Sequence, residues 1–335
     1  NILQTPLTIA IQASNGASDY GNKFGQPIIL GSFTSFEQMI GTEHYAWRKT
    51  CMVAGGIGHI RNEHIKKQTP RPGDLIVQLG GAGYWIGMGG GSASSKDAGS
   101  QSEILDFDSV QRADPEMETR VNEVLRGCSD LGNKNPIITG TDLGAGGESV
   151  ALTEIAFPHG AHYELRDIPS GDHSMPPYVL WCNESQERVV VIVRPRGLKL
   201  LKQICERNRC PVAVVGKVTG DGKLVVTDKL APIDAPPEQQ KPVELDMSYL
   251  LAELPRMTIT CTRQNRILSP LKIPSEMTVE KLLEQVLRLP KIASKHWLTS
   301  KVDRSVGGLV AQQQTVGQLQ LPLSDCAVTA DPFFS

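Results

Sequence analysis

The sequence lacks the features that would place it in a membrane or on nucleic acid. No apolar run in its 335 residues approaches the roughly 18 that a membrane-spanning helix needs. The first ten residues, NILQTPLTIA, contain neither the basic segment nor the cleavage signal of a secretory leader. The formal net charge is only -2, so there is no excess of positive charge to attract a phosphate backbone. We therefore expect neither a membrane nor a nucleic-acid partner.

Cysteine pairs, metal-ligand sets and nucleophile signatures are equally scarce. The seven cysteines are scattered without C-x-x-C spacing, and their odd number favours a reducing compartment, so we predict a cytoplasmic protein. His59 and His64 lie five positions apart, which keeps them off one common face of a helix. Cys182 has no histidine beside it in the sequence to activate its thiol. The sequence therefore offers neither a zinc set nor a catalytic triad.

What the chain does contain is an ordinary supply of core residues. Hydrophobic residues make up 40% of the 335, enough to fill a core, and this length is typical of two domains. The sequence starts without Met and ends on DCAVTADPFFS, from which we expect a piece of something longer.

Strand and helix signals alternate between residues 72 and 230. A turn, a strand and a glycine stop are predicted over 72–81. Asp114 is suited to cap a helix that begins at Pro115, and the apolar residues on one face of that helix are Met117, Val121, Val124, Leu125 and Cys128. The remaining predictions are a strand, glycine-rich turn and helix start over 135–149, two strands around a polar segment over 178–195, an amphipathic helix over 197–208, and a hairpin around Gly220, Asp221 and Gly222.

The flanking segments carry weaker signals. Turn residues dominate the first 40 positions apart from a short strand predicted at 27–30, and residues 41–50 are expected to be a connector. Proline and charge mark 231–246 as a linker. A helix is predicted over 277–290, followed by two strands that glycines interrupt. We therefore predict one compact α/β domain at about 45–230, between two partial units.

The stretch TDLGAGGES, residues 141–149, is the first candidate for a site. Its glycines let backbone N–H groups approach an anion, and the helix start behind them adds a favourable field. A phosphate-binding loop would place Lys and Ser or Thr after the glycines, whereas Glu148 follows here and would repel a phosphate. Asp142 suits Mg²⁺, which prefers carboxylates together with substrate phosphates. From the spacing alone, a structural turn and a metal site both remain open.

The stretch GGAGYWIGMGGGSASS, residues 80–95, looks like a dinucleotide-binding fingerprint. Gly81, Gly83 and Gly87 miss the G-x-G-x-x-G spacing by one residue, and no acidic residue closes a following strand about 20 residues later. A bend in which two backbones pack closely explains the glycines equally well, and the serine hydroxyls could line a polar pocket.

Two further segments place polar side chains where a ligand could reach them. WCNESQERV, residues 181–189, sets Glu184, Ser185 and Gln186 between apolar stretches, and these groups could hydrogen-bond a hydroxylated ligand. Gln111 stands just before the helix capped at Asp114. A polar loop and a helix cap account for the two segments as well, so the pattern alone does not decide.

Taken together, several segments resemble one family. ASNGASDYGNKFGQP, AGGIGHI, GMGGGSASS, DFDSVQRADPEME, TDLGAGG, WCNESQER and KVDRSVGGLVAQQQTVG are similar to phosphoribosylformylglycinamidine synthase in its large single-chain form, a member of the AIR-synthetase-like superfamily. The resemblance runs over nearly the whole chain. It implies an ATP-dependent ligase of purine biosynthesis, which amidates formylglycinamide ribonucleotide to formylglycinamidine ribonucleotide with ammonia that a glutaminase domain releases from glutamine.

The resemblance also implies an α/β (α+β) fold of AIR-synthetase-like repeats, each with an A and a B half. Residues 1–44 would be the end of the first A half, 45–230 the first B domain, 231–274 a linker and 275–335 the start of the second A half. Such a chain holds only part of the synthetase region, and we expect it to be inactive alone. Its partners would be the small-molecule substrates and the other domains of the same enzyme.

The implied cofactors are Mg²⁺ and ATP. Asp142 matches one Mg²⁺ ligand of the family, and Asp325 matches a second metal-binding aspartate. The positions that match contacts to the ribonucleotide substrate are Gln111, Glu184, Ser185 and Gln186. The positions that match nucleotide contacts are Leu30, Gly31, Ser32 and Ser324, although the family usually has an aromatic residue where Ser32 stands. No catalytic residue is assigned.

Two other interpretations stay open. The chain could be a non-catalytic nucleotide-binding or structural portion of that enzyme, since Asp325 lies near a nucleotide site thought to be structural in the family. The glycines of 80–91 could instead serve a dinucleotide oxidoreductase. A thermal-shift screen separates these interpretations: stabilisation by ATP with Mg²⁺, or by the ribonucleotide, favours the first two, and stabilisation by NAD(H) favours the oxidoreductase.

Overall fold

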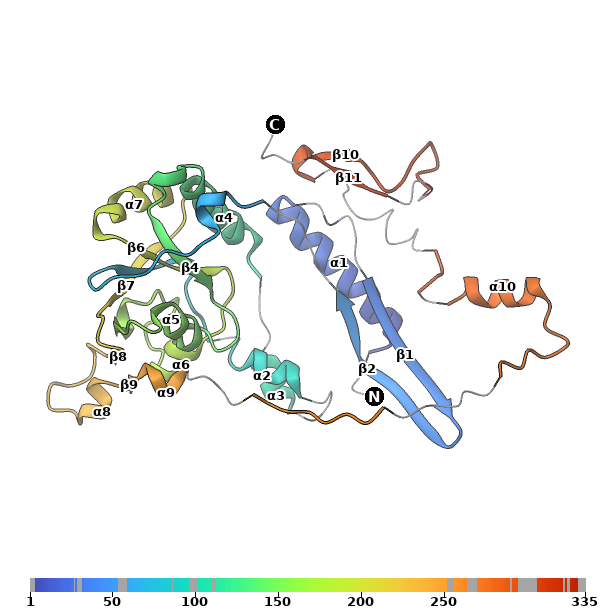
Figure 1. Ribbon diagram of the computed structural model, residues 1–335, viewed down its shortest axis with the longest axis horizontal. Coiled ribbons are helices and arrows are strands. Elements are labelled where there is room, and N and C mark those ends of the chain that lie inside the picture. The colour runs from blue at the N-terminus through green and yellow to red at the C-terminus, as the bar shows by residue number, and fades with distance from the viewer. Residues whose placement is uncertain are drawn as a thin grey trace. The chain divides into compact units, whose positions relative to one another are not determined.

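The computed structural model describes residues 4–26, 28, 32–53, 59–85, 87–96, 100, 102–109, 113–251, 256–263, 270–289, 291–294, 306–321, 323 and 326–330. The chain divides into two compact units (Figure 1). The larger is built from residues 56–252 together with 19–26, and the smaller from residues 4–18, 27–55 and those beyond 252. No helix in the described ranges combines the length and the apolar character needed to cross a membrane.

The larger unit is built on a seven-stranded sheet in the order β4-β6-β3-β7-β5-β8-β9. Its strands are β3 Leu75–Gly80, β4 Ile137–Asp142, β5 Ala161–Glu164, β6 Arg188–Val193, β7 Val212–Val218, β8 Lys223–Thr227 and β9 Val243–Asp246. β5 and β8 run parallel, and each of the other neighbouring pairs is antiparallel. Strands β3 and β6 are buried on both faces, which explains their almost continuous apolar sequences.

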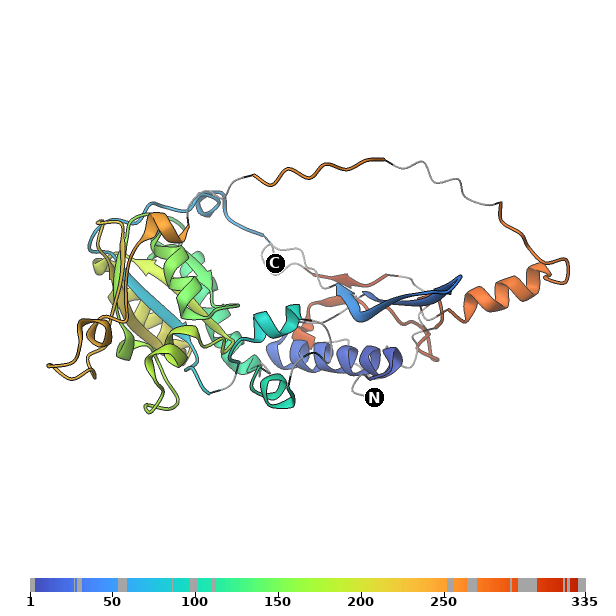
Figure 2. The same ribbon diagram turned by 90° about the horizontal axis from the view of Figure 1, so that it is seen from below.

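Helices cover both faces of this sheet (Figure 2). The helices of this unit are α2 Gly90–Ser95, α3 Glu103–Asp108, α4 Pro115–Ser129, α5 Glu148–Ala156, α6 Pro177–Cys182, α7 Leu198–Arg207, α8 Pro237–Gln240 and α9 Met247–Leu250, with 3-10 turns at Asn62–His64, Gly132–Lys134, Leu165–Asp167 and Pro195–Gly197. Because side chains alternate along a strand, Val77 and Leu79 pack with α4 and α7, whereas Ile76 packs with α5 and α6 on the other face. Two apolar cores therefore enclose the sheet.

Elements with strong local signals are confirmed. The predicted strand of 72–81 is β3, and the predicted helices of the 114–130, 197–208 and 277–290 regions are α4, α7 and α10 Val279–Leu287. The Asp114 carboxylate accepts a hydrogen bond of 3.0 Å from the backbone N–H of Met117, and Pro115 opens α4 as expected. The buried face of this helix carries Val121, Val124 and Cys128.

The prediction of two strands over 178–195 is wrong in its first half. Residues 177–182 form α6, with Pro177 in its first turn. Val179 and Leu180 are buried in the core on the α5 side, so their apolar run belongs to a covered helix and not to a strand. A short apolar run has no periodicity that would separate these two structures.

The predicted hairpin around Gly220, Asp221 and Gly222 is also wrong. β7 and β8 are not partners, because β5 lies between them and pairs with both. The chain entering β5 fits inside the turn: the carbonyl oxygen of Gly160 accepts from the N–H of Thr219 at 3.1 Å. A third strand inserted into a turn leaves no signal in the local sequence.

Part of the predicted linker joins the sheet. Val243–Asp246 forms β9, which pairs antiparallel with β8 at the edge of the sheet. The four domain ranges given by the resemblance stay predictions, and β9 lies within the range 231–274 that they assign to the linker.

The smaller unit holds the elements that the sequence signalled least. A helix, α1 Pro6–Phe24, occupies the region expected to be turns, and Asn15–Gly16 lies inside it. Its residues up to 18 belong to this unit, and residues 19–24 belong to the larger one. The expected connector of 41–50 belongs to a hairpin, in which β1 Ser32–Ile40 pairs with β2 Glu43–Val53. The unit also contains α10 Val279–Leu287, a 3-10 turn Val306–Gly308, and the pair β10 Val310–Gln312 and β11 Val328–Thr329. The strand predicted at 27–30 lies outside the described residues apart from Ile28.

Candidate functional site

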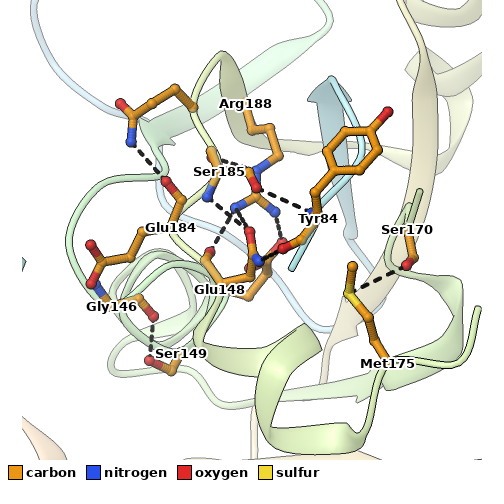
Figure 3. A network of polar contacts seen from close by, with 11 residues as sticks. Tyr84, Gly146, Glu148, Ser149, Ser170, Met175, Glu184, Ser185 and Arg188 are labelled. Atoms are coloured by element: carbon orange, nitrogen blue, oxygen red, sulfur yellow. Dashed lines mark hydrogen bonds and ion pairs between the residues drawn. The ribbon is translucent and has the colours of Figure 1, made fainter. Parts of the chain in front are cut away.

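Three segments that the sequence singled out separately meet at one edge of the large sheet (Figure 3). β3 ends at Gly80, β4 ends at Asp142, and β6 begins at Arg188. β6 lies between the other two strands and runs antiparallel to both, with Gly80 opposite Arg188 and Asp142 opposite Val189. The ends of β3 and β4 therefore lie beside the start of β6, and the glycine loop 80–95, the turn 142–149 and the polar loop 183–187 come together.

Asn183 connects the polar loop to the glycine loop. Its side-chain amide donates to the carbonyl oxygen of Tyr84, and its Oδ1 accepts from the N–H of Ser185 at 2.8 Å. The Oγ of Ser185 in turn accepts from the N–H of Tyr84 at 3.2 Å. Asn183 also forms a β-bridge with Met88 further along the glycine loop. These contacts fix the backbone of both loops relative to each other.

Glu184 connects the other two segments. Its Oε2 accepts from the N–H of Gly91 at 2.8 Å, and its Oε1 accepts from the N–H of Gly146 at 2.9 Å. The residue is only 4% exposed. Since Gly91 already donates to a carboxylate, its N–H is not presented to a pyrophosphate, which weighs against the oxidoreductase interpretation. The Gln186 side chain folds back onto the same loop and donates to the carbonyl oxygen of Glu184 at 2.8 Å.

A buried ion pair lies beneath the polar loop. The side chains of Arg188 and Glu148 are both 0% exposed and bonded to each other. Arg188 also donates from Nε to the carbonyl oxygen of Ser185 and from Nη2 to that of Asn183, each at 2.7 Å. Burial raises the pKa of Glu148 to about 7, because the loss of solvent outweighs the opposing charge of Arg188.

Sequence reasoning missed this pair. The sequence pattern presents Glu148 only as a group that would repel a phosphate, and it assigns no role to Arg188. The signal that could have found Arg188 is a single charge at the start of the strand RVVVIV, whose other residues are all apolar. A charge in that position is expected to have a buried partner.

The glycines of the turn and the loop are explained by close contacts with neighbouring segments of the chain. A Cβ on Gly147, whose φ is 58°, would lie 2.0 Å from the carbonyl oxygen of Asn183. A Cβ on Gly91 would lie 2.6 Å from that of Ala145. Both distances are too short for any side chain, so these positions are limited to glycine by the neighbouring segment. The bend with closely packed backbones, one of the two explanations given for 80–95, accounts for Gly80, on which a Cβ would lie 2.1 Å from the carbonyl oxygen of Glu187.

Asp142 is exposed at the end of β4 and has an acidic neighbour. Burial and the negative charge of Asp142 raise the pKa of Glu118 on α4. Burial likewise raises the pKa of Glu187, which accepts a hydrogen bond of 3.1 Å from the hydroxyl of Tyr20. An exposed carboxylate beside a second carboxylate is the donor chemistry that suits Mg²⁺. In the described ranges, no group of three or more His, Cys, Asp or Glu could hold a metal ion, so Asp142 would share a cation with other groups.

The remaining predicted site residues are not placed at this edge. Gln111, Leu30, Gly31, Ser324 and Asp325 lie outside the described residues. Ser32 is the first residue of β1 and belongs to the smaller unit. Of the ten residues that the resemblance selected, the structure therefore brings four together: Asp142, Glu184, Ser185 and Gln186.

A separate cleft of about 270 Å³ lies beside β4. It is lined by Thr139, Gly140, Thr141, the segment 67–70 and residues of 154–159. None of its lining residues comes from the glycine loop or the polar loop, and we place the candidate site at the edge where those loops meet.

Comparisons with known proteins identify the family of this chain. Residues 71–229 match the family AIR synthase related protein, C-terminal domain, and residues 294–335 match the FGAR-AT PurM_N-like domain. The phosphoribosylformylglycinamidine synthase of Homo sapiens is 44% identical over 335 residues, which cover 97% of this chain. The chain belongs to the phosphoribosylformylglycinamidine synthase family. The probable chloroplastic/mitochondrial phosphoribosylformylglycinamidine synthase of Arabidopsis thaliana is 43% identical over 99% of the chain.

The chain spans about a quarter of the length of these synthases, 25% of the human protein and 24% of the plant protein. It is thus a portion of the large phosphoribosylformylglycinamidine synthase, within the synthetase region. The name of the Arabidopsis relative assigns that protein to organelles, and the cytoplasmic location stays a prediction for this chain.

Solved structures of the synthetase share the fold. T. maritima PurL complexed with FGAR is 25% identical and covers 81% of this chain, which matches 42% of that protein with a TM-score of 0.59. The same protein complexed with ATP is similar at a TM-score of 0.54 and 22% identity, over 81% of this chain and 40% of that one. The predicted α/β class with AIR-synthetase-like domains is confirmed.

Proposed function

We propose that this chain contributes the first B half of the synthetase site in a phosphoribosylformylglycinamidine synthase. The complete enzyme would amidate formylglycinamide ribonucleotide with ATP and glutamine-derived ammonia. The observation that carries the proposal is the meeting of Asp142 with the Ser185–Gln186 loop at one sheet edge. Support also comes from the synthase relatives and from a PurL structure whose ligand is FGAR.

Each part of the edge has a distinct task in this proposal. Ser185 and Gln186 are half-buried at the surface of the polar loop and would hydrogen-bond the ribonucleotide. Asp142 would hold Mg²⁺, which neutralises phosphate charge during transfer of a phosphoryl group from ATP to the amide oxygen. The carboxylate of Glu118 lies near enough to sense the charge of Asp142, so a cation at Asp142 would relieve repulsion between them.

The other predicted positions complete the proposal. Gln111 would be a further substrate contact, and the nucleotide contacts would be Leu30, Gly31, Ser32 and Ser324. Asp325 would bind the second metal. The ammonia would come from a glutaminase domain of the same enzyme. Because the 335-residue chain spans only about a quarter of its relatives and would hold only part of the synthetase site, it is expected to be inactive by itself even when ammonia is supplied.

The test is release of ADP with formylglycinamide ribonucleotide, ATP, Mg²⁺ and ammonium chloride, which replaces the glutaminase. We expect the complete enzyme to release ADP only when the ribonucleotide is present, and the 335-residue chain to release none. In the complete enzyme, Gln186→Ala should raise KM for the ribonucleotide by at least about tenfold, a loss of about 1.4 kcal/mol. Lys223→Ala, on the remote strand β8, is the control. A KM within twofold of the parent in Gln186→Ala would refute the assignment of the polar loop.

A further inference from the structure

We propose that Glu184 is a positioning residue of this edge, and not a group that binds the substrate. Its carboxylate holds the glycine loop and the Asp142 turn against each other. That the polar loop binds a substrate and that Asp142 binds a metal rest on the proposed function. The contacts made by Glu184 do not depend on it.

Both oxygens of the carboxylate are engaged within the protein. Oε2 accepts from Gly91 at 2.8 Å and Oε1 from Gly146 at 2.9 Å, so each oxygen takes one backbone N–H from a different segment. A carboxylate only accepts hydrogen bonds, which matches two converging donors, and its charge strengthens both bonds. With 4% of the residue exposed, little of the carboxylate is left for a ligand to reach.

The two segments touch each other where Glu184 joins them. A Cβ on Gly91 would lie 2.6 Å from Ala145 and 3.7 Å from Oε1 of Glu184. A Cβ on Gly87 would lie 3.3 Å from the carbonyl carbon of Glu184. The glycine loop is therefore packed on Ala145 and on the Glu184 backbone at once. Releasing the carboxylate would remove the polar bonds that hold this packing in place.

Glu184 is itself held from below. The residues on either side of it, Asn183 and Ser185, offer the carbonyl oxygens to which Arg188 donates at 2.7 Å. Arg188 is fixed by the buried carboxylate of Glu148. The Glu184 backbone therefore has little freedom, and a rigid acceptor sets the positions of both glycine N–H groups.

The residues of the polar loop have different roles. Glu184 faces inward, whereas Ser185 and Gln186 are more exposed. Ser185 accepts one hydrogen bond from Tyr84, and its hydroxyl still carries a proton to donate. The polar contacts to a ribonucleotide would then come from Ser185 and Gln186, with Glu184 setting the distance between this loop and Asp142.

Hydrogen exchange in the complete enzyme, without any ligand, tests the inference. Glu184→Ala removes both acceptors, and Glu184→Gln keeps the shape but turns an N–H donor towards one of the two glycine N–H groups. We expect peptides covering 88–95 and 143–149 to exchange at least about tenfold faster in Glu184→Ala, and at least one of them to do so in Glu184→Gln. Gln186→Ala is the matched control, and it should leave both peptides unchanged.

A role as substrate ligand predicts the opposite pattern. Exchange of both peptides within twofold of the parent, together with a raised KM for the ribonucleotide, would overturn the positioning role. The positioning role predicts that Glu184→Ala lowers kcat and raises the Mg²⁺ concentration needed for half-maximal rate, because the carboxylate no longer holds the Asp142 turn in place. If the Glu184→Ala variant unfolds, hydrogen exchange also rises across β3 and β6. The exchange of the two peptides in Glu184→Gln then decides whether Glu184 has the positioning role. Faster exchange in an enzyme without ribonucleotide-dependent ADP release would refute the proposed function and leave the positioning role intact.

Discussion

Replacing Arg188 by methionine should be one of the most damaging single changes in the larger unit. It leaves the carboxylate of Glu148, which is 0% exposed, without its partner. Removing one member of a buried ion pair costs about 3–5 kcal/mol, and the lost bonds to two backbone carbonyls add about 1 kcal/mol each. The stability of a whole domain is only about 5–15 kcal/mol, so we expect a large part of it to be lost.

The free energy of opening of the sheet is the quantity to measure. Native-state hydrogen exchange at the buried amides of β3 and β6 reports it without requiring the entire chain to unfold in one step. The matched control is the double change Glu148→Leu with Arg188→Met, which replaces the pair by apolar groups. The free energy of opening of this double variant should be at least about 2 kcal/mol higher than that of Arg188→Met, since replacing a buried ion pair as a whole often leaves stability unchanged. A double variant as unstable as Arg188→Met would refute the argument that an unpaired charge causes the loss.

The effect should also depend on pH in a defined direction. The folded-state pKa of Glu148 is about 7, above the ordinary value of 4.5. A carboxyl group whose pKa is raised by folding stabilises the folded protein below its unfolded-state pKa. This contribution to stability is lost as the pH rises through the folded-state pKa. Removing Arg188 removes the charge that lowers this pKa, so the folded pKa rises further. Arg188→Met should therefore be more destabilised relative to the parent at pH 8 than at pH 5, and an equal deficit at both would contradict this cause.

Three other changes have equally direct outcomes. Asp142→Asn in the complete enzyme should lower turnover by at least about tenfold, or about 1.4 kcal/mol of barrier, and unchanged kinetics at limiting Mg²⁺ would remove its metal role. Gly147→Ala should cost about 1–3 kcal/mol in a thermal melt, because its Cβ would lie 2.0 Å from a carbonyl oxygen, whereas Gly144→Ala, with nothing within 4 Å, should stay within about 0.5 kcal/mol. Asp228→Asn should cost about 3 kcal/mol at pH 7, since the bidentate bond from Arg166 lowers the pKa of Asp228. A carboxyl group whose pKa is lowered by folding contributes stability that is lost as the pH falls. The stability lost in Asp228→Asn should therefore shrink below about pH 4, and a loss that is constant with pH would point to packing instead.

The sequence predicted the elements whose signals are local. α4 has its own cap at Asp114 and its own apolar stripe, and β3 is bounded by turn residues, so neither depends on distant contacts. The failures share a tertiary cause. β7 and β8 are separated because β5 enters between them, and the apolar run at 177–182 became a helix under a core that the sequence does not display. The two glycines and two asparagines of α1 favour turns, yet a helix of 19 residues tolerates them, since each glycine costs only about 1 kcal/mol.

The candidate site was predictable in its parts and not in its connections. Glycine turns and a polar loop are visible as composition, and each was selected. Which carboxylate faces inward was not visible, because Glu184 meets Gly91 across 93 positions of sequence and Gly146 across 38. The pairing of Glu148 with Arg188 spans 40 positions and depends on the order of the strands. Contacts of this kind follow from topology, which no local pattern contains.

The close approach of Gly91 to Ala145 has a consequence for how such enzymes diverge. With 2.6 Å between the two Cβ positions, only one methyl group fits, and it can belong to either residue. Gly91→Ala should therefore be tolerated only in combination with Ala145→Gly. Related sequences are expected to carry either glycine at 91 with alanine at 145, or alanine at 91 with glycine at 145. A lineage would pass from one pair to the other through an intermediate with glycine at both positions.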